Sequence, residues 1–117
     1  MEPGKHLILD FYGCDSELLN NYEQLKDLFE ESLSVCNATV LKITGNKFEP
    51  QGVTLLALLA ESHASLHSWP EYNYCAMDYY TCGNAARPGN SRTFISETRS
   101  KCSFDKKLGT LFKIVYI

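Results

Sequence analysis

Reactive side chains gather in one short stretch near the middle of this 117-residue chain. Residues 60–71 read Ala-Glu-Ser-His-Ala-Ser-Leu-His-Ser-Trp-Pro-Glu, and Thr-Cys-Gly follows at residues 81–83. A serine follows a glutamate here, two imidazoles lie four residues apart, and the only tryptophan precedes a proline and a second carboxylate. A hydroxyl, an imidazole and a thiol can act as nucleophile, base and acid. Because such a density of reactive groups is unusual for a core, this stretch is the candidate functional site.

The two histidines of this stretch could instead form a metal pair, because His63 and His67 are spaced i, i+4. In the HExxH pattern of metalloproteases a glutamate follows the first histidine, whereas this chain has Ala64 at that place. Pro70 also argues against a helix that continues through the segment. We therefore expect no metal site.

The stretch ESHASLHSWPE followed by TCG closely resembles the self-cleavage and active-site segment of bacterial and archaeal S-adenosylmethionine decarboxylase proenzymes. The resemblance extends to residues 4–15 (GKHLILDFYGCD) and 47–54 (KFEPQGVT), and it ends after Gly83, where residues 85–91 break the family's long helix. It implies decarboxylation of S-adenosylmethionine to the aminopropyl donor for spermidine, in a protein whose protomers pair as homodimers. It also implies that the protein makes its own pyruvoyl cofactor.

The chemistry explains why such a cofactor is needed. Decarboxylation of an α-amino acid leaves a carbanion at Cα, and enzymes stabilise it with pyridoxal phosphate or a pyruvoyl group. The sequence has no glycine-rich phosphate loop for pyridoxal phosphate. A pyruvoyl group can form if the Ser62 hydroxyl attacks the Glu61 carbonyl, converts the amide into an ester, and then undergoes β-elimination and hydrolysis. The single domain, residues 1–117, would thereby become a β chain of residues 1–61 and an α chain of residues 62–117.

The resemblance implies a role for each matching residue in self-cleavage and catalysis. Glu61 and Ser62 would flank the scissile bond, and Ser62 would be the pyruvoyl precursor. His67 matches the processing base, and Thr54 stands where the family has a serine or threonine that assists cleavage. Cys82 matches the catalytic acid, which would protonate the substrate carbon after carbon dioxide leaves. A thiol suits this task because its pKa of about 8.5 lies not far above neutral pH.

Substrate contacts are also implied by the resemblance. Phe48 would stack on the adenine ring, Glu71 would hold the ribose hydroxyls, and His67 would line the adenine side. Two other functions stay open from the residues. A pyruvoyl enzyme for free ornithine or arginine would leave Phe48 without a task, and a non-catalytic homologue that regulates a partner subunit would have no need of Ser62, His67 and Cys82 together.

Composition excludes several classes of protein. The net charge of −3 with interspersed acids and bases gives no footprint for nucleic acid or for a membrane surface. The longest largely apolar stretch, residues 53–60, has only the length of a strand, so we expect neither a signal peptide nor a spanning helix, and a cytoplasmic protein. Five cysteines without a CxxC pair favour reduced thiols over a disulfide framework or a zinc site.

The spacing of apolar residues predicts the helices and strands that carry these reactive side chains. An apolar stripe at steps of three and four predicts one helix that is capped at Asp15 or Ser16 and runs to about Val35. Residues 53–61 are apolar on both parities, which predicts a strand covered on both faces. Further strands are expected at residues 6–12, 39–44, 74–82 and 109–117, loops at 48–52 and 83–92, and a short helix at 93–101. This irregular order predicts an α+β two-layer sandwich, with a mainly antiparallel sheet packed on helices.

Overall fold

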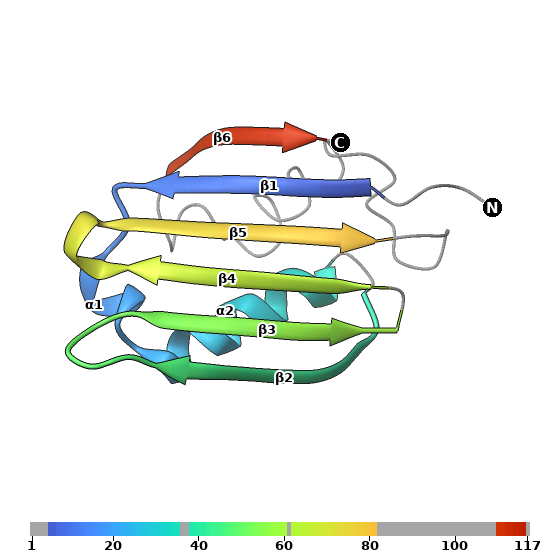
Figure 1. Cartoon of the computed structure of the whole chain (residues 1–117), viewed down its shortest axis with the longest axis horizontal. Helices are drawn as coiled ribbons and strands as arrows, with labels where there is room; N and C mark the ends of the chain where they lie inside the picture. Colours follow the sequence, from blue (N-terminus) through green and yellow to red (C-terminus); the bar gives the residue numbers. More distant parts are fainter. Residues whose placement is uncertain (1–4, 36–37, 61, 82–109, 117) are drawn as a thin grey trace.

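The computed structural model describes residues 5–35, 38–60, 62–81 and 110–116. They form a six-stranded sheet of order β2-β3-β4-β5-β1-β6 in which all neighbouring strands are antiparallel. Figure 1 shows the helices behind this sheet, so the chain has two layers. The predicted α+β sandwich is therefore confirmed. Among the described residues, no helix has both the length and the apolar character needed to cross a membrane.

The elements follow one another without a regular strand–helix repeat. In chain order they are β1 (Lys5–Tyr12), α1 (Ser16–Leu19), α2 (Tyr22–Val35), β2 (Val40–Lys47), β3 (Val53–Leu59), β4 (His63–Trp69), the short 3₁₀-helix η1 (Pro70–Tyr72), β5 (Tyr74–Thr81) and β6 (Thr110–Tyr116). The sequence pattern did not predict β4, whose polar and apolar residues alternate. The loop expected at 83–92 and the helix at 93–101 lie outside the described residues, as does the break at 85–91.

The predicted single helix is in fact two helices. Asp15 caps α1 as expected, and its side chain accepts a hydrogen bond from the Glu17 N–H at 3.0 Å. The chain then leaves helical geometry at Asn20, and the Asn21 side chain caps α2 by accepting the Gln24 N–H at 3.0 Å. Asparagine favours caps over helix interiors because its amide competes for backbone groups. The interruption frees the Asn20 side chain for a contact elsewhere.

The core lies between α2 and the inner face of the sheet. Leu25, Phe29 and Leu33 of the predicted helical stripe are buried, while Leu18 and Tyr22 pack at its edge. Every second residue of the four central strands completes this core: Leu7, Leu9 and Phe11 of β1, Val53, Leu55, Ala57 and Leu59 of β3, Ala64 and Leu66 of β4, and Cys75, Met77 and Tyr79 of β5.

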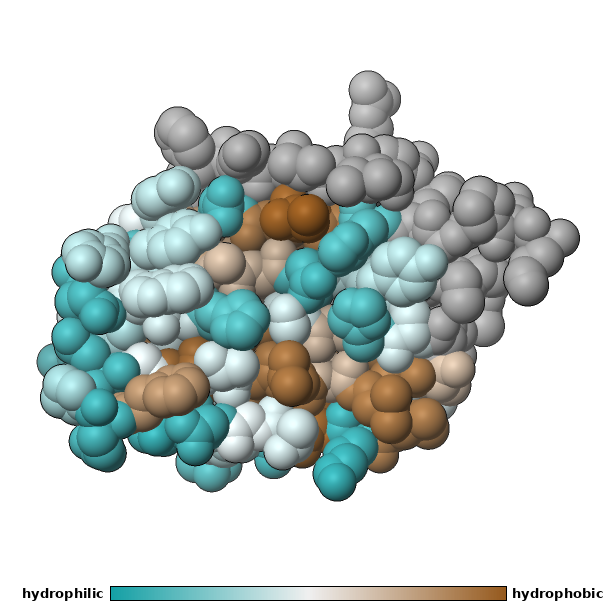
Figure 2. All heavy atoms as spheres, in the orientation of Figure 1, coloured by the Kyte–Doolittle hydropathy of each residue, from teal (hydrophilic) through white to brown (hydrophobic). Residues whose placement is uncertain are grey.

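The expectation that the strand after residue 53 is covered on both faces is wrong for the single chain. Burial alternates along β3, and Leu56 and Leu58 remain 48% and 55% exposed. The reason is that the described helices cover only the inner face. With Leu41, these leucines leave apolar surface on the outer face, over the β2–β3 side seen in Figure 2. An exposed apolar patch of this kind is typical of an interaction surface.

The buried thiols should be chemically silent. Cys14 and Cys75 are buried, and burial raises the pKa of Cys14 to about 11 and that of Cys75 well above its ordinary value. At pH 8 roughly one in 10³ molecules of a thiol with this pKa is ionised, against about a quarter at an ordinary pKa of 8.5. We expect iodoacetamide at pH 8 to leave both unlabelled in the folded protein and to label both in guanidinium, as read by peptide mass spectrometry. Rapid labelling of either in the native chain would contradict this.

Candidate active site

The hairpin of β3 and β4 places two candidate residues in direct contact. Thr54 and His67 are register partners, and the Thr54 Oγ1 lies 3.1 Å from the His67 Nδ1. Both side chains are half-buried on the outer face, because strand alternation points their neighbours into the core. The Thr54 hydroxyl and the His67 imidazole therefore have the geometry of a hydrogen bond, a contact that the sequence did not predict.

A pocket of about 290 Å³ surrounds this pair. Its lining brings together four of the candidate residues: Phe48, Thr54, His67 and Glu71, with Gln51, Gly52, Ser68 and Trp69. Glu71 reaches it because Pro70 opens η1 immediately after β4. A larger hollow of about 450 Å³ lies over the helices, and no described candidate residue lines it.

Four hydrogen bonds that sequence reasoning missed hold the pocket in shape. The Phe48 N–H donates to the Gly52 carbonyl at 2.8 Å, and the Gly52 N–H donates to the Asn20 side chain at 3.0 Å. Beneath them the buried Ser68 hydroxyl donates to the Leu19 carbonyl at 2.7 Å and accepts the Val53 N–H at 2.9 Å. The Asn20-Asn21 pair, which interrupts the helical stripe, was the feature of the sequence that could have indicated these contacts.

Gly52→Ala should disturb the pocket, because Gly52 has φ = 110° and a Cβ there would lie 3.4 Å from the Ser68 carbonyl oxygen. A residue forced into such a conformation costs about 1–3 kcal/mol. We expect Tm to fall by several degrees and the fluorescence of Trp69, the only tryptophan and a pocket residue, to shift. Gly13→Ala is the matched control, since Gly13 also has positive φ but open space around its Cβ. Equal Tm and emission in Gly52→Ala and the unmodified chain would contradict this.

Ser62 lies at the opposite end of β4 from His67. Its hydroxyl donates to the Tyr80 carbonyl of β5, and its own carbonyl accepts the Leu59 N–H at 3.0 Å, which closes the β3–β4 connection. His67 lies five positions further along the extended strand, a distance of roughly 16 Å from Ser62. Because a base must come within hydrogen-bond reach of the proton it removes, His67 cannot remove a proton from Ser62 of the same chain in this arrangement.

The candidate residues therefore fall into two groups. Thr54, His67, Phe48 and Glu71 share the pocket, whereas Ser62 lies at the far end of the hairpin. Glu61 and Cys82 lie outside the described residues. Their chain neighbours are described: Ser62 follows Glu61 and directly precedes β4, and Thr81 precedes Cys82 and ends β5. Because His63 pairs with Tyr80, Ser62 and Thr81 lie at the same end of the sheet.

The alternative of a His63–His67 metal pair is excluded by the strand. The i, i+4 spacing brings two side chains together on a helix, but four residues along a strand span roughly 13 Å. His63 and His67 both belong to β4. They cannot share one ion within this chain.

Comparison with known proteins assigns this chain to a family. The family model described as S-adenosylmethionine decarboxylase matches residues 5–100. The chain is 42% identical over 102 residues to the S-adenosylmethionine decarboxylase proenzyme of Methanococcus aeolicus, which covers 87% of each chain. It is 40% identical over 94 residues to that of Caldicellulosiruptor saccharolyticus, covering 80% of this chain and 76% of the relative.

A solved structure agrees with the sequence matches. The adenosylmethionine decarboxylase of Aquifex aeolicus superposes with a TM-score of 0.73 at 28% identity, over 97% of this chain and 86% of that one. Because the family model extends to residue 100 and the structural match to nearly the whole chain, the expectation that the resemblance ends after Gly83 is wrong. The chain belongs to the S-adenosylmethionine decarboxylase family.

Proposed function

We propose that this chain is a proenzyme that cuts itself between Glu61 and Ser62 and then decarboxylates S-adenosylmethionine to the aminopropyl donor for spermidine. The family supports this activity over the decarboxylation of free ornithine or arginine and over a non-catalytic role. The observation that carries the proposal is the pocket that joins the Thr54–His67 hydrogen bond to Phe48 and Glu71. Relatives that carry the name proenzyme support the self-cleavage.

The position of Ser62 suits the cleavage. It lies in the short connection between two paired strands, and its hydroxyl proton is directed to the Tyr80 carbonyl, which leaves oxygen lone pairs available for attack. Attack on the Glu61 carbonyl forms the ester and breaks the C–N bond, whose nitrogen becomes the amine of Ser62. Removal of the Ser62 Cα proton then expels the Glu61 carboxylate and leaves a dehydroalanine, which water hydrolyses to the pyruvoyl group and ammonia. The two products stay together because β3 and β4 remain paired from Thr54–His67 to Leu58–His63.

The proposed reaction requires a pyruvoyl group derived from Ser62. Once formed, this group would supply a carbonyl that withdraws electrons from the substrate Cα. The remaining tasks belong to the chain. The half-exposed Phe48 ring offers a stacking surface for adenine, and the exposed Glu71 carboxylate can accept hydrogen bonds from both ribose hydroxyls. Cys82 donates the proton that replaces the departing carbon dioxide.

A second copy of the chain completes the active site in this proposal. The roughly 16 Å between Ser62 and His67 is too long for proton transfer within one chain. A two-fold dimer is isologous, so the Ser62 end of one protomer can meet the His67 end of its partner. The apolar surface of Leu41, Leu56 and Leu58 on the outer face supports packing of two sheets against each other.

Two measurements test the proposal. A mass spectrum of the purified protein should give residues 1–61 and 62–117 as separate masses, the second with a blocked start. Carbon dioxide release should then be measured with labelled S-adenosylmethionine, ornithine and arginine. An intact chain after long incubation would refute the self-cleavage, and release from ornithine or arginine but not from S-adenosylmethionine would refute the substrate.

Cys82→Ala should separate catalysis from processing. The thiol protonates the substrate carbon but takes no part in breaking the Glu61–Ser62 bond. Because general acid catalysis contributes roughly 10²–10⁴-fold, kcat should fall by at least about 10²-fold while the cleavage rate stays close to that of the unmodified chain. Steady-state kinetics and a time course of fragment formation measure the two. Equal loss of both activities would contradict the separate roles.

A further inference from the structure

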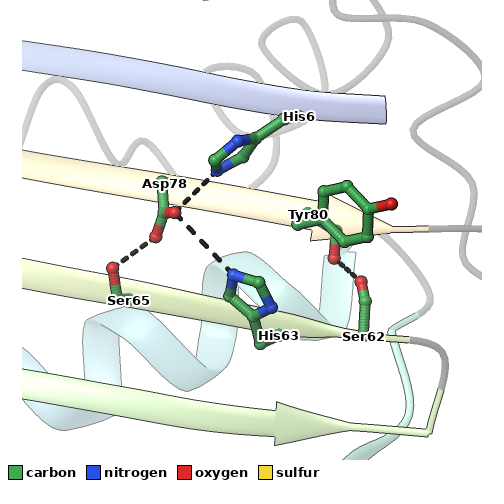
Figure 3. Close-up of polar contacts among 6 residues, drawn as sticks. All are labelled: His6, Ser62, His63, Ser65, Asp78 and Tyr80. Atoms are coloured by element: carbon green, nitrogen blue, oxygen red, sulfur yellow. Dashed lines mark hydrogen bonds and ion pairs between the residues drawn. The ribbon is translucent and has the colours of Figure 1, made fainter. Parts of the chain in front are cut away.

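A second cluster of chemically capable side chains lies on the outer face, away from the pocket. His6 of β1 and His63 of β4 are both register partners of Tyr80 in β5, and Asp78 lies two residues before Tyr80 on the same face. Figure 3 shows both imidazoles turned toward the Asp78 carboxylate. Its Oδ2 lies 2.7 Å from the His6 Nε2 and 3.9 Å from the His63 Nε2.

We propose that His6, His63 and Asp78 form a binding site for a divalent transition-metal ion of the Zn²⁺ type. Two imidazoles and one carboxylate are a recurrent donor set for such ions, with one or more positions left for water. One ligand atom from each residue lies within 4.8 Å of the others. A tetrahedral ion with bonds of about 2.0–2.1 Å needs donor atoms about 3.3 Å apart, so small side-chain rotations suffice.

Neighbouring groups orient all three ligands. The Ser65 hydroxyl donates to the other carboxylate oxygen of Asp78, Oδ1, which leaves Oδ2 facing the imidazoles. The His63 ring stacks on Tyr80 with centroids 5.6 Å apart and planes 14° apart, and the His6 ring meets Tyr80 edge-on at 5.6 Å. Contacts that fix ligand orientation in this way strengthen metal binding.

The site is accessible and lies next to the cleavage site. The side chains of His6, His63 and Asp78 are 31%, 55% and 24% exposed, so an ion can enter and keep a water ligand. His63 directly follows Ser62, and the Tyr80 carbonyl accepts the Ser62 hydroxyl. A bound ion would therefore link β1 and β5 to β4, the strand that begins directly after Ser62. The proposed metal site does not depend on which substrate the enzyme decarboxylates.

Calorimetric titration of the metal-free chain with Zn²⁺ and with Ni²⁺ tests the site. We expect saturable binding of one ion per chain. Loss of a ligand in His63→Gln or Asp78→Asn should weaken binding by more than about 10²-fold, and Ser65→Ala by roughly 10-fold. Asp10→Asn is the matched control, because Asp10 is a half-buried carboxylate of β1 bonded instead to Tyr74. It should keep the affinity of the unmodified chain.

Two further readouts begin from the unmodified chain, and the first of them needs no variant. Co²⁺ should give d–d absorption without a sulfur-to-cobalt charge-transfer band, which separates this site from cysteine coordination. Zn²⁺ should raise Tm by mass action, and it should fail to do so in Asp78→Asn. The proposal is overturned if no saturable binding is found, if affinity is unchanged in both His63→Gln and Asp78→Asn, or if the cobalt spectrum shows a thiolate ligand. In that case the cluster would be only a contact between imidazoles and a carboxylate, without affinity for a metal ion.

Discussion

Ser62→Ala should leave the chain uncut and without decarboxylase activity. Alanine has no hydroxyl to attack the Glu61 carbonyl, and it cannot be converted into the ketone on which the electron sink depends. The loss should be complete, because a single substitution removes both the nucleophile of processing and the precursor of the cofactor. Mass spectrometry should show one species at the mass of the full chain, and carbon dioxide release should remain at background.

The control for this variant is Ser34→Ala, which removes the same hydroxyl from an exposed position on α2. It should be cut and active like the unmodified chain. Circular dichroism should show that Ser62→Ala keeps its fold, since within the described part of the chain its side chain makes a single hydrogen bond, to the Tyr80 carbonyl. Cleavage at the same bond in Ser62→Ala, or decarboxylation by the uncut variant, would refute the assignment.

Two inactive variants should restore activity when they are combined. Ser62→Ala and His67→Ala, each inactive alone, are expected to complement each other when co-expressed with different affinity tags. The reason is the roughly 16 Å that separates these residues in one chain, which requires His67 to act on the Ser62 of a partner. A mixed dimer then has one site with both residues intact and one with neither. Isolated mixed dimers should show about half the activity of the unmodified dimer.

The same experiment distinguishes the arrangement of the site from the identity of its residues. No recovery in isolated mixed dimers would mean that each active site is built within one chain, contrary to the proposal. High activity of His67→Ala alone would remove the role of this histidine. Mixed dimers of Ser62→Ala with unmodified chain provide the reference for a dimer with one functional site.

Local sequence patterns were enough for much of the framework. The burial of Leu25, Phe29 and Leu33 follows from helical spacing, and the cap at Asp15 follows from its side-chain chemistry. The single long helix was wrong because Asn21 caps the start of α2 by accepting the Gln24 N–H, while Asn20 accepts the Gly52 N–H outside the helices. Apolar periodicity does not reveal such side-chain contacts. The strand β4 was not predicted, although His63, Ser65 and His67 on its outer side alternate with Ala64 and Leu66 in the core. The polar Ser68, buried on the inner side, interrupts the apolar half of this pattern.

The amino-acid sequence alone establishes the set of reactive residues around Ser62 and much of the strand pattern that carries them. Which of these residues come into contact depends on how the strands pair. Thr54 and His67 are joined by strand register, while Ser62 and His67, close in sequence, are held at opposite ends of an extended strand. His6, His63 and Asp78 come together from three strands although they are distant along the chain. The physical reason is that distance along a chain becomes distance in space only through the geometry of the elements, and contacts between strands depend on a register that local sequence does not contain.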